Sequence, residues 1–156
     1  MNDRIISGVE VVKRSNINDE RGYIQHFLNS RGDSLYNLEE IYFSIVYNGS
    51  VKAWHYHKEM SMNYFCVFGM IKLVLIDTRE YSPTNGILNE FFMGEKNPIT
   101  VLIPKMVWNG FKGFGDREFS IVSNATDFIH DKNEIIREHP HSGIFKDIYD
   151  WERKDG

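Results

Sequence analysis

Short apolar segments recur along this chain, several of them alternating with polar residues, and glycine, proline or asparagine separates them. Such segments are typical of β-strands bounded by turns. Asn48-Gly49 is the strongest hairpin signal among those turns. The pattern predicts strands over residues 5–12, 23–28, 38–47, 50–57, 63–68, 70–76, 87–93, 99–103 and 118–123.

Many short strands at regular spacing predict an all-β sandwich or barrel. One short helix is expected near the C-terminus, over residues 131–137, with Asp131 as its N-terminal cap. The length of 156 residues fits a single domain spanning 1–156. Apolar residues make up 42% of the chain, which is enough for a core and too many for a disordered protein.

Charge, hydropathy and cysteine usage narrow the class of protein. A net charge of −4 without a basic stripe argues against a nucleic-acid partner. No apolar run approaches the roughly 18 residues that cross a bilayer, so no membrane association is expected. Residues 1–4 carry no apolar signal segment, and the single cysteine, Cys66, excludes a disulfide framework within the chain. We therefore expect a cytoplasmic protein.

The segment VKAWHYHKEM, residues 51–60, contains the chain's most distinctive chemistry. Side chains alternate between the two faces of a strand, so His55 and His57 point one way, and Trp54 and Tyr56 point the other. Two imidazoles inside a barrel are costly unless they bind a ligand or are hydrated. The pair therefore either serves a pocket or lies on a solvent-exposed face, and the segment alone leaves both readings open.

The surrounding spacing resembles the first motif of the cupin superfamily, a set of jelly-roll barrels. That motif's glutamate ligand falls on Met62, and the histidine of the second cupin motif falls on Asn109. A thioether and an amide are poor ligands for zinc, iron or manganese. We therefore expect a barrel with no metal and no cofactor, and a metal-binding cupin remains the alternative.

Five motifs, in order along the chain, resemble the dTDP-4-dehydrorhamnose 3,5-epimerase family of cupins. They are DERG at 19–22, VKAWHYH at 51–57, IDTREYSPTNG at 76–86, LIPKMVWNGF at 102–111 and YDW at 149–151. The resemblance implies a homodimer that binds a nucleotide-diphosphate sugar. It further implies epimerisation beside the keto group of a 4-keto-6-deoxy sugar, in surface polysaccharide biosynthesis.

The same resemblance assigns roles to individual residues. His55 falls on the family's catalytic base, a role that suits imidazole because its ordinary pKa lies near neutral pH. Arg21 and Lys52 fall where the family holds the diphosphate. His57 replaces a glutamine and is a candidate second acid–base group. The remaining candidate substrate-binding residues are Tyr42, Tyr64, Trp108 and Asn109.

Two departures from the family pattern keep other functions open. The family lysine beside the enolate oxygen falls on Met62, and the tyrosine that protonates the opposite face falls near Ile121. Two histidines in H-x-H form on a barrel strand also resemble the dTDP-sugar 3,4-ketoisomerases, which work on one face of the sugar. A third interpretation is a barrel that binds a sugar nucleotide and has lost the chemistry.

Overall fold

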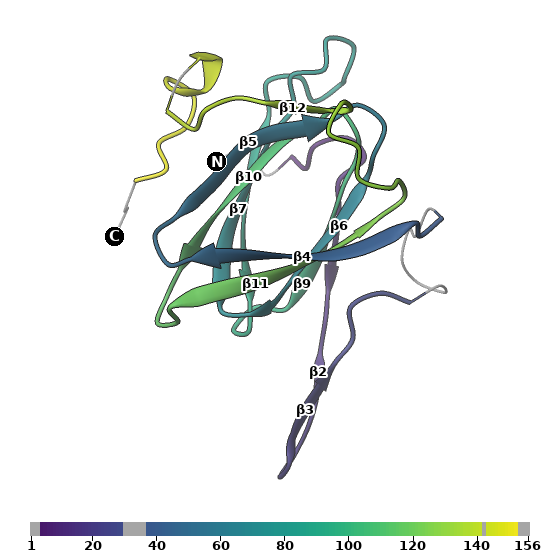
Figure 1. Ribbon diagram of the computed structural model, residues 1–156, viewed down its shortest axis with the longest axis vertical. Helices are drawn as coiled ribbons and strands as arrows, with labels where there is room; N and C mark the ends of the chain where they lie inside the picture. The colour runs from purple at the N-terminus through teal and green to yellow at the C-terminus, as the bar shows by residue number, and fades with distance from the viewer. Residues whose placement is uncertain (1–3, 30–36, 142, 153–156) are drawn as a thin grey trace.

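Two five-stranded sheets form the body of the molecule in the computed structural model, which describes residues 4–29, 37–141 and 143–152. The first sheet has the order β1–β9–β6–β11–β4, and the second has the order β12–β5–β10–β7–β8. All pairings between the named strands are antiparallel. The sheets curve around one interior, as Figure 1 shows, and the all-β expectation is confirmed.

Most strand bounds follow the apolar segments closely, but the strand expected over 5–12 forms only from residue 10 onward. The first sheet contains β1 (Glu10–Lys13), β4 (Glu40–Tyr47), β6 (Met62–Phe68), β9 (Ile99–Ile103) and β11 (Phe119–Thr126). The second contains β5 (Val51–His57), β7 (Met70–Ile76), β8 (Leu88–Gly94), β10 (Trp108–Phe114) and β12 (Ile135–Arg137). A separate hairpin, β2 (Asn16–Asp19) and β3 (Gly22–Gln25), projects away from the barrel in Figure 1.

Apolar side chains from both sheets fill the barrel interior. Met62 and Tyr64 of β6, Leu73 of β7 and Val101 of β9 are all at most 2% exposed and belong to one cluster. Cys66 is 1% exposed in the same cluster, as an unpaired thiol. This packing occupies one end of the interior and leaves the β5 side to more polar side chains.

A second cluster of large aromatic side chains covers the outer face of β5 and β10. Trp54 lies 5.0 Å from Phe145 and 4.9 Å from Trp151, measured between ring centroids. Phe145 belongs to the only helical element of the described residues, the 3-10 turn Gly143–Phe145. The segment after β12 therefore lies over the outside of the barrel and fixes β5 from behind. Within the described part of the chain, no helix has the length and hydrophobicity that a membrane crossing requires.

Two sequence predictions were wrong in this region. The helix expected over 131–137 is a turn followed by β12, because those residues pair with the open edge of β5 and so satisfy its backbone groups. The strand β10 was not predicted, because Gly110 and Gly113 interrupt its apolar pattern. Gly110 is needed there for space, since a Cβ at this position would lie 2.3 Å from the Cβ of Ala53.

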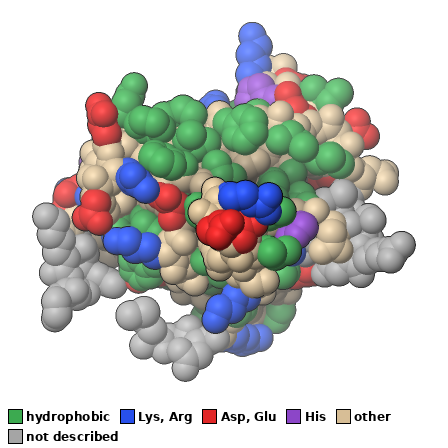
Figure 2. All heavy atoms as spheres, turned by 90° about the horizontal axis from the view of Figure 1, so that it is seen from below, with side chains coloured by type: hydrophobic (Ala, Val, Ile, Leu, Met, Phe, Trp, Pro, Cys, Tyr) green, Lys and Arg blue, Asp and Glu red, His purple; other side chains and the backbone are tan. Residues whose placement is uncertain are grey.

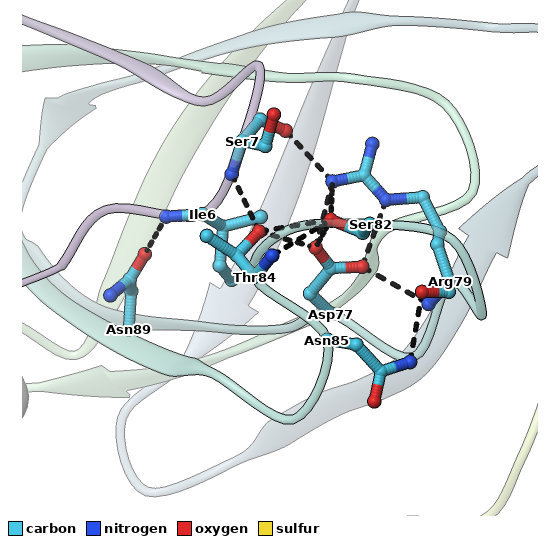
Figure 3. Close-up of polar contacts among 8 residues, drawn as sticks. All are labelled: Ile6, Ser7, Asp77, Arg79, Ser82, Thr84, Asn85 and Asn89. Carbon is cyan, nitrogen blue, oxygen red and sulfur yellow. Dashed lines mark hydrogen bonds and ion pairs between the residues drawn. The ribbon is translucent and has the colours of Figure 1, made fainter.

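The motif IDTREYSPTNG builds a turn after β7 that holds the N-terminal segment, as Figure 3 shows. Asp77 is fully buried and accepts hydrogen bonds from Arg79, Ser82 and Thr84 at 2.6–2.8 Å. Although burial opposes ionisation, these hydrogen bonds hold the pKa of Asp77 well below its ordinary value. Thr84 in turn accepts a hydrogen bond from the Ser7 backbone N–H. This motif is therefore structural, and it ties Ser7 to the barrel.

Replacing this carboxylate should destabilise the fold more than it disturbs any chemistry. We expect Asp77→Asn to cost about 3 kcal/mol of unfolding free energy, because a buried ion pair and several charge-assisted hydrogen bonds lose their acceptor. Urea denaturation measures the cost. Asp116→Asn is the matched control, because Asp116 is 87% exposed and pairs only with Lys96 at the surface. Equal midpoints for the two variants would contradict this role for Asp77.

Candidate active site

A cavity of about 590 Å³ lies between the two sheets and is lined by side chains of β4, β5, β6, β10 and β12. This volume is in the range of small-molecule binding pockets. Its lining includes Tyr42 of β4, Tyr64 of β6, and Lys52, His55 and His57 of β5. The structure thus brings five of the eight predicted site residues to one cavity.

A β-bulge in β5 explains why Lys52 shares a face with the histidines. Between Lys52 and His55 the strand has two intervening residues, whereas β10 has only one between their partners Phe111 and Asn109. Ala53 and Trp54 both pack against the outer aromatic cluster as a result. Simple alternation would place Lys52 and His55 on opposite faces, and the bulge brings both to the cavity.

His55 is partly buried and poised as a neutral imidazole. Its ring lies 5.6 Å from the ring of His57, nearly perpendicular to it, and its Nε2 lies 3.5 Å from the Tyr64 hydroxyl. Burial lowers the pKa of His55 to about 3, with smaller contributions from His57 and Arg137. At neutral pH this side chain therefore carries no charge and has a nitrogen free to accept a proton.

Tyr64 and Asn109 form a polar contact behind His55. The Tyr64 hydroxyl donates to Asn109 Oδ1 at 3.3 Å, and Asn109 Nδ2 donates to the His55 carbonyl at 3.0 Å. Asn109 is fully buried and lies outside the cavity lining, where it supports Tyr64 from behind. Burial raises the pKa of Tyr64 well above 10 and that of Tyr42 to about 12, so both stay protonated as phenols.

His57 is bound to a carboxylate that the sequence did not reveal. Its Nδ1 contacts Glu134 Oε1, and Glu134 Oε2 accepts a hydrogen bond from the Glu59 backbone N–H at 3.2 Å. Burial lowers the pKa of His57 and the carboxylate opposes that shift. A neutral His57 donates its Nδ1 proton to Glu134, which leaves Nε2 as the acceptor. Glu134 precedes β12 and was hidden by the helix prediction for that segment.

Two other predicted site residues lie away from this cavity. Trp108 is 7% exposed and packs on the outer face, where its ring lies 4.6 Å from Tyr56 and 4.8 Å from Phe145. Arg21 lies at the turn of the projecting β2–β3 hairpin, where its side chain is 84% exposed and pairs with Asp19 at 2.6 Å. Neither side chain lines the cavity of its own chain.

The donor set of the site is poor in metal ligands. Among the residues that the structure describes, no three His, Cys, Asp or Glu side chains converge on one point. Met62, at the cupin glutamate position, is 1% exposed in the apolar core, and Glu134 already occupies the Nδ1 of His57. The metal-free interpretation of this barrel stays a prediction.

Unfolding free energy is expected to fall as the pH drops below about 6.5, the ordinary pKa of histidine. Between that value and about 3, the unfolded chain binds a proton at His55 that the folded protein does not, so acid favours unfolding. The lowered pKa values of His57 and Glu134 act in the same direction.

Chemical denaturation at pH 7, 6 and 5 measures this dependence, which approaches about 1.4 kcal/mol per pH unit for each proton taken up. In His55→Gln, the slope of unfolding free energy against pH should decrease by up to the contribution of one proton. A wild-type stability that stays constant or rises on acidification would show that these side chains are not held neutral.

Known proteins are similar to this chain in sequence and in fold. The sequence matches the family model described as dTDP-4-dehydrorhamnose 3,5-epimerase over residues 3–145. It is 34% identical over 122 residues to the spore coat polysaccharide biosynthesis protein SpsL of Bacillus subtilis, covering 78% of this chain and 81% of SpsL. It is 38% identical over 111 residues to Agl13 of Haloferax volcanii, a probable low-salt glycan biosynthesis epimerase, covering 69% of this chain and 70% of Agl13.

A solved structure supports the same relationship. The crystal structure of a dTDP sugar isomerase from Desulfovibrio desulfuricans G20 superimposes with a TM-score of 0.87 at 34% identity, covering 96% of this chain and 94% of that one. The expected jelly-roll fold and the family resemblance drawn from five motifs are both confirmed. This chain belongs to the dTDP-4-dehydrorhamnose 3,5-epimerase family, whose members are isomerase-class enzymes of nucleotide sugars.

Proposed function

We propose that this protein epimerises or isomerises a 4-keto-6-deoxy sugar carried on a nucleoside diphosphate, in the synthesis of a surface polysaccharide, with His55 as the base. One observation carries the proposal: a neutral, partly buried imidazole lies in a cavity of substrate size, beside a phenol. A carbon next to a ketone can lose a proton to a neutral imidazole, and the product is an enolate. The burial that keeps His55 neutral also weakens it as a base, so the base role requires the bound substrate to raise its pKa. SpsL and Agl13 are named for polysaccharide and glycan biosynthesis, which supports the same pathway class.

The enolate oxygen needs a hydrogen-bond donor, and this chain supplies phenols. The lysine that the family resemblance would place there is Met62, which is buried in the apolar core. Tyr64 and Tyr42 line the cavity and keep their protons because burial raises the pKa of each. A fixed donor in a site of low dielectric stabilises developing charge strongly. We assign the role to Tyr64, whose hydroxyl lies 3.5 Å from His55 Nε2. Its single proton must then turn from Asn109 Oδ1 to the enolate oxygen when the substrate binds.

The paired histidines favour a second candidate reaction, the 3,4-ketoisomerase type. His57 lies on the same face as His55, with 5.6 Å between ring centroids and its Nε2 available once Nδ1 contacts Glu134. One base can take a proton from one carbon and return it to its neighbour, while the second moves the hydroxyl proton between the two oxygens of the enediol. An epimerase must instead return the proton to the opposite face of the same carbon.

Deuterium exchange separates these chemistries. Incubation with dTDP-4-keto-6-deoxyglucose in heavy water should introduce deuterium at a ring carbon beside the ketone. Wash-in with inverted configuration indicates epimerisation, and wash-in with a migrated ketone indicates isomerisation. His55→Ala should abolish exchange, and His141→Ala, an exposed histidine outside the cavity, should retain it. Absence of exchange with dTDP, UDP, GDP and CDP forms of the sugar would leave a binding protein without this activity.

We further propose that the protein acts as a homodimer. On the outer face of β4, the described residues leave four large apolar side chains 42–64% exposed: Ile41, Phe43, Ile45 and Tyr47. Figure 2 shows hydrophobic side chains gathered in a broad band across one side of the molecule. Apolar patches of this kind mark interaction surfaces. Because Arg21 lies on the projecting hairpin, its proposed role at the diphosphate requires the cavity of a second copy.

Phe43→Asp should shift the protein from dimer to monomer in sedimentation velocity, because it places a charge in that apolar face. Tyr81→Asp is the matched control, since Tyr81 is 94% exposed and lies in a turn outside β4. For Arg21, a mixed dimer of Arg21→Ala and His55→Ala chains contains one intact site, so co-expression should recover exchange that neither variant shows alone. A monomeric wild-type protein, or no recovery in the mixture, would contradict this arrangement.

A further inference from the structure

The last residue of β12, Arg137, faces the candidate base. In the antiparallel pairing of β12 with β5, Arg137 lies opposite His55 and Ile135 lies opposite His57. Residues directly opposite each other in such a pair project from the same face of the sheet. Arg137 accordingly belongs to the cavity lining, while its exposure places it toward the mouth.

The charge of Arg137 reaches the groups that line the cavity. It contributes to lowering the pKa of His55 and of His57, after burial and other causes, and it opposes the rise that burial causes in the pKa of Tyr42. Lys52, the other cation of the lining, lies on the same face through the bulge in β5. The cavity of a single chain therefore presents two cations beside His55.

Two carboxylates lie near Arg137 in the chain. Glu134 contacts His57 and the Glu59 backbone N–H. Glu138 follows Arg137 and also lines the cavity, with its carboxylate beside Gly143. Across the described ranges 4–29, 37–141 and 143–152, no ion pair involves Arg137. A guanidinium at a pocket mouth without a carboxylate partner is suited to bind an anion from solution.

We propose that Arg137, together with Lys52, binds the diphosphate of the nucleotide sugar while the sugar lies at His55. The proposal rests on the function proposed above, which supplies the diphosphate. The planar fork of a guanidinium holds two phosphate oxygens at once, a contact that the ammonium group of Lys52 cannot make. Arg21, on its projecting hairpin, is absent from this cavity, so Arg137 supplies the arginine that the chain's own site otherwise lacks.

This placement also couples binding to chemistry. A bound diphosphate neutralises the charge of Arg137, which is one of the influences that keep the pKa of His55 low. His55 thus becomes a stronger base when the substrate is in place than when the cavity holds water. Arg137, at the end of β12, therefore affects the diphosphate affinity directly and the basicity of His55 indirectly.

Isothermal titration calorimetry with nucleoside diphosphates tests the assignment. The wild type is titrated with dTDP, UDP, GDP and CDP, and the tightest binder is used with every variant, beside its nucleoside without phosphates. Arg137→Ala should weaken nucleoside diphosphate binding by about tenfold or more and leave nucleoside binding unchanged. Arg137→Lys should fall between, because it keeps the charge and loses the fork. The slope of affinity against salt concentration should also decrease in Arg137→Ala.

Lys132→Ala is the matched control, because it removes one exposed charge from the same segment outside the cavity and should bind like the wild type. Equal thermal unfolding of all variants shows that the folds are intact. Unchanged diphosphate affinity in Arg137→Ala overturns this assignment, even where wild-type deuterium exchange upholds the proposed function. Weakened affinity supports it, even where no sugar undergoes exchange. A wild type that binds none of the four diphosphates overturns both proposals.

Discussion

The backbone pairing between β5 and β12 is the interaction on which the candidate site depends. Trp54 N–H donates to the Glu138 carbonyl at 2.7 Å, and Glu138 N–H returns a hydrogen bond to the Trp54 carbonyl at 2.9 Å. This short ladder fixes the register that places Glu134 at His57 and Arg137 opposite His55. A slip of one residue would turn the guanidinium away from the cavity. The pairing of β12 with the edge of β5 therefore brings a carboxylate and a guanidinium to the two imidazoles.

The rest of the fold holds β5 in place from its other sides. Outside, Trp54 packs among Phe145, Tyr149 and Trp151, so the strand's outer face is covered by the chain's own C-terminal segment. Beside it, β10 approaches closely at Gly110 and accommodates the bulge that brings Lys52 into the cavity. Close packing on these sides restricts the side chains of the inner face, and a restricted base loses less freedom when substrate binds.

The sequence predicted the parts of the site that obey local rules. His55 and His57 share a face because strand side chains alternate, and the motif order identified the family. Lys52 reached its predicted site only through a bulge that alternation does not foresee. The sequence did not predict Glu134 and Arg137 as site residues, because their segment resembles a capped helix. Its pairing with a strand about 80 residues earlier is non-local, and local patterns do not predict such pairing. Trp108 was predicted as a pocket aromatic because β10 was not predicted as a strand. In that strand Asn109 and Phe111 face inward and Trp108 faces outward.

The proposed proton transfer depends on an uncharged imidazole at position 55. This ring lies beside a second imidazole, which is bound to a carboxylate. Nitrogen-15 NMR of the histidine rings, titrated from pH 8 to pH 4, with His55 assigned by its loss in His55→Gln, measures that state directly. We expect His55 to stay neutral down to about pH 4 and His57 to keep its proton on Nδ1, facing Glu134. A His55 ring that titrates near 6.5, as in a solvent-exposed histidine, would contradict it.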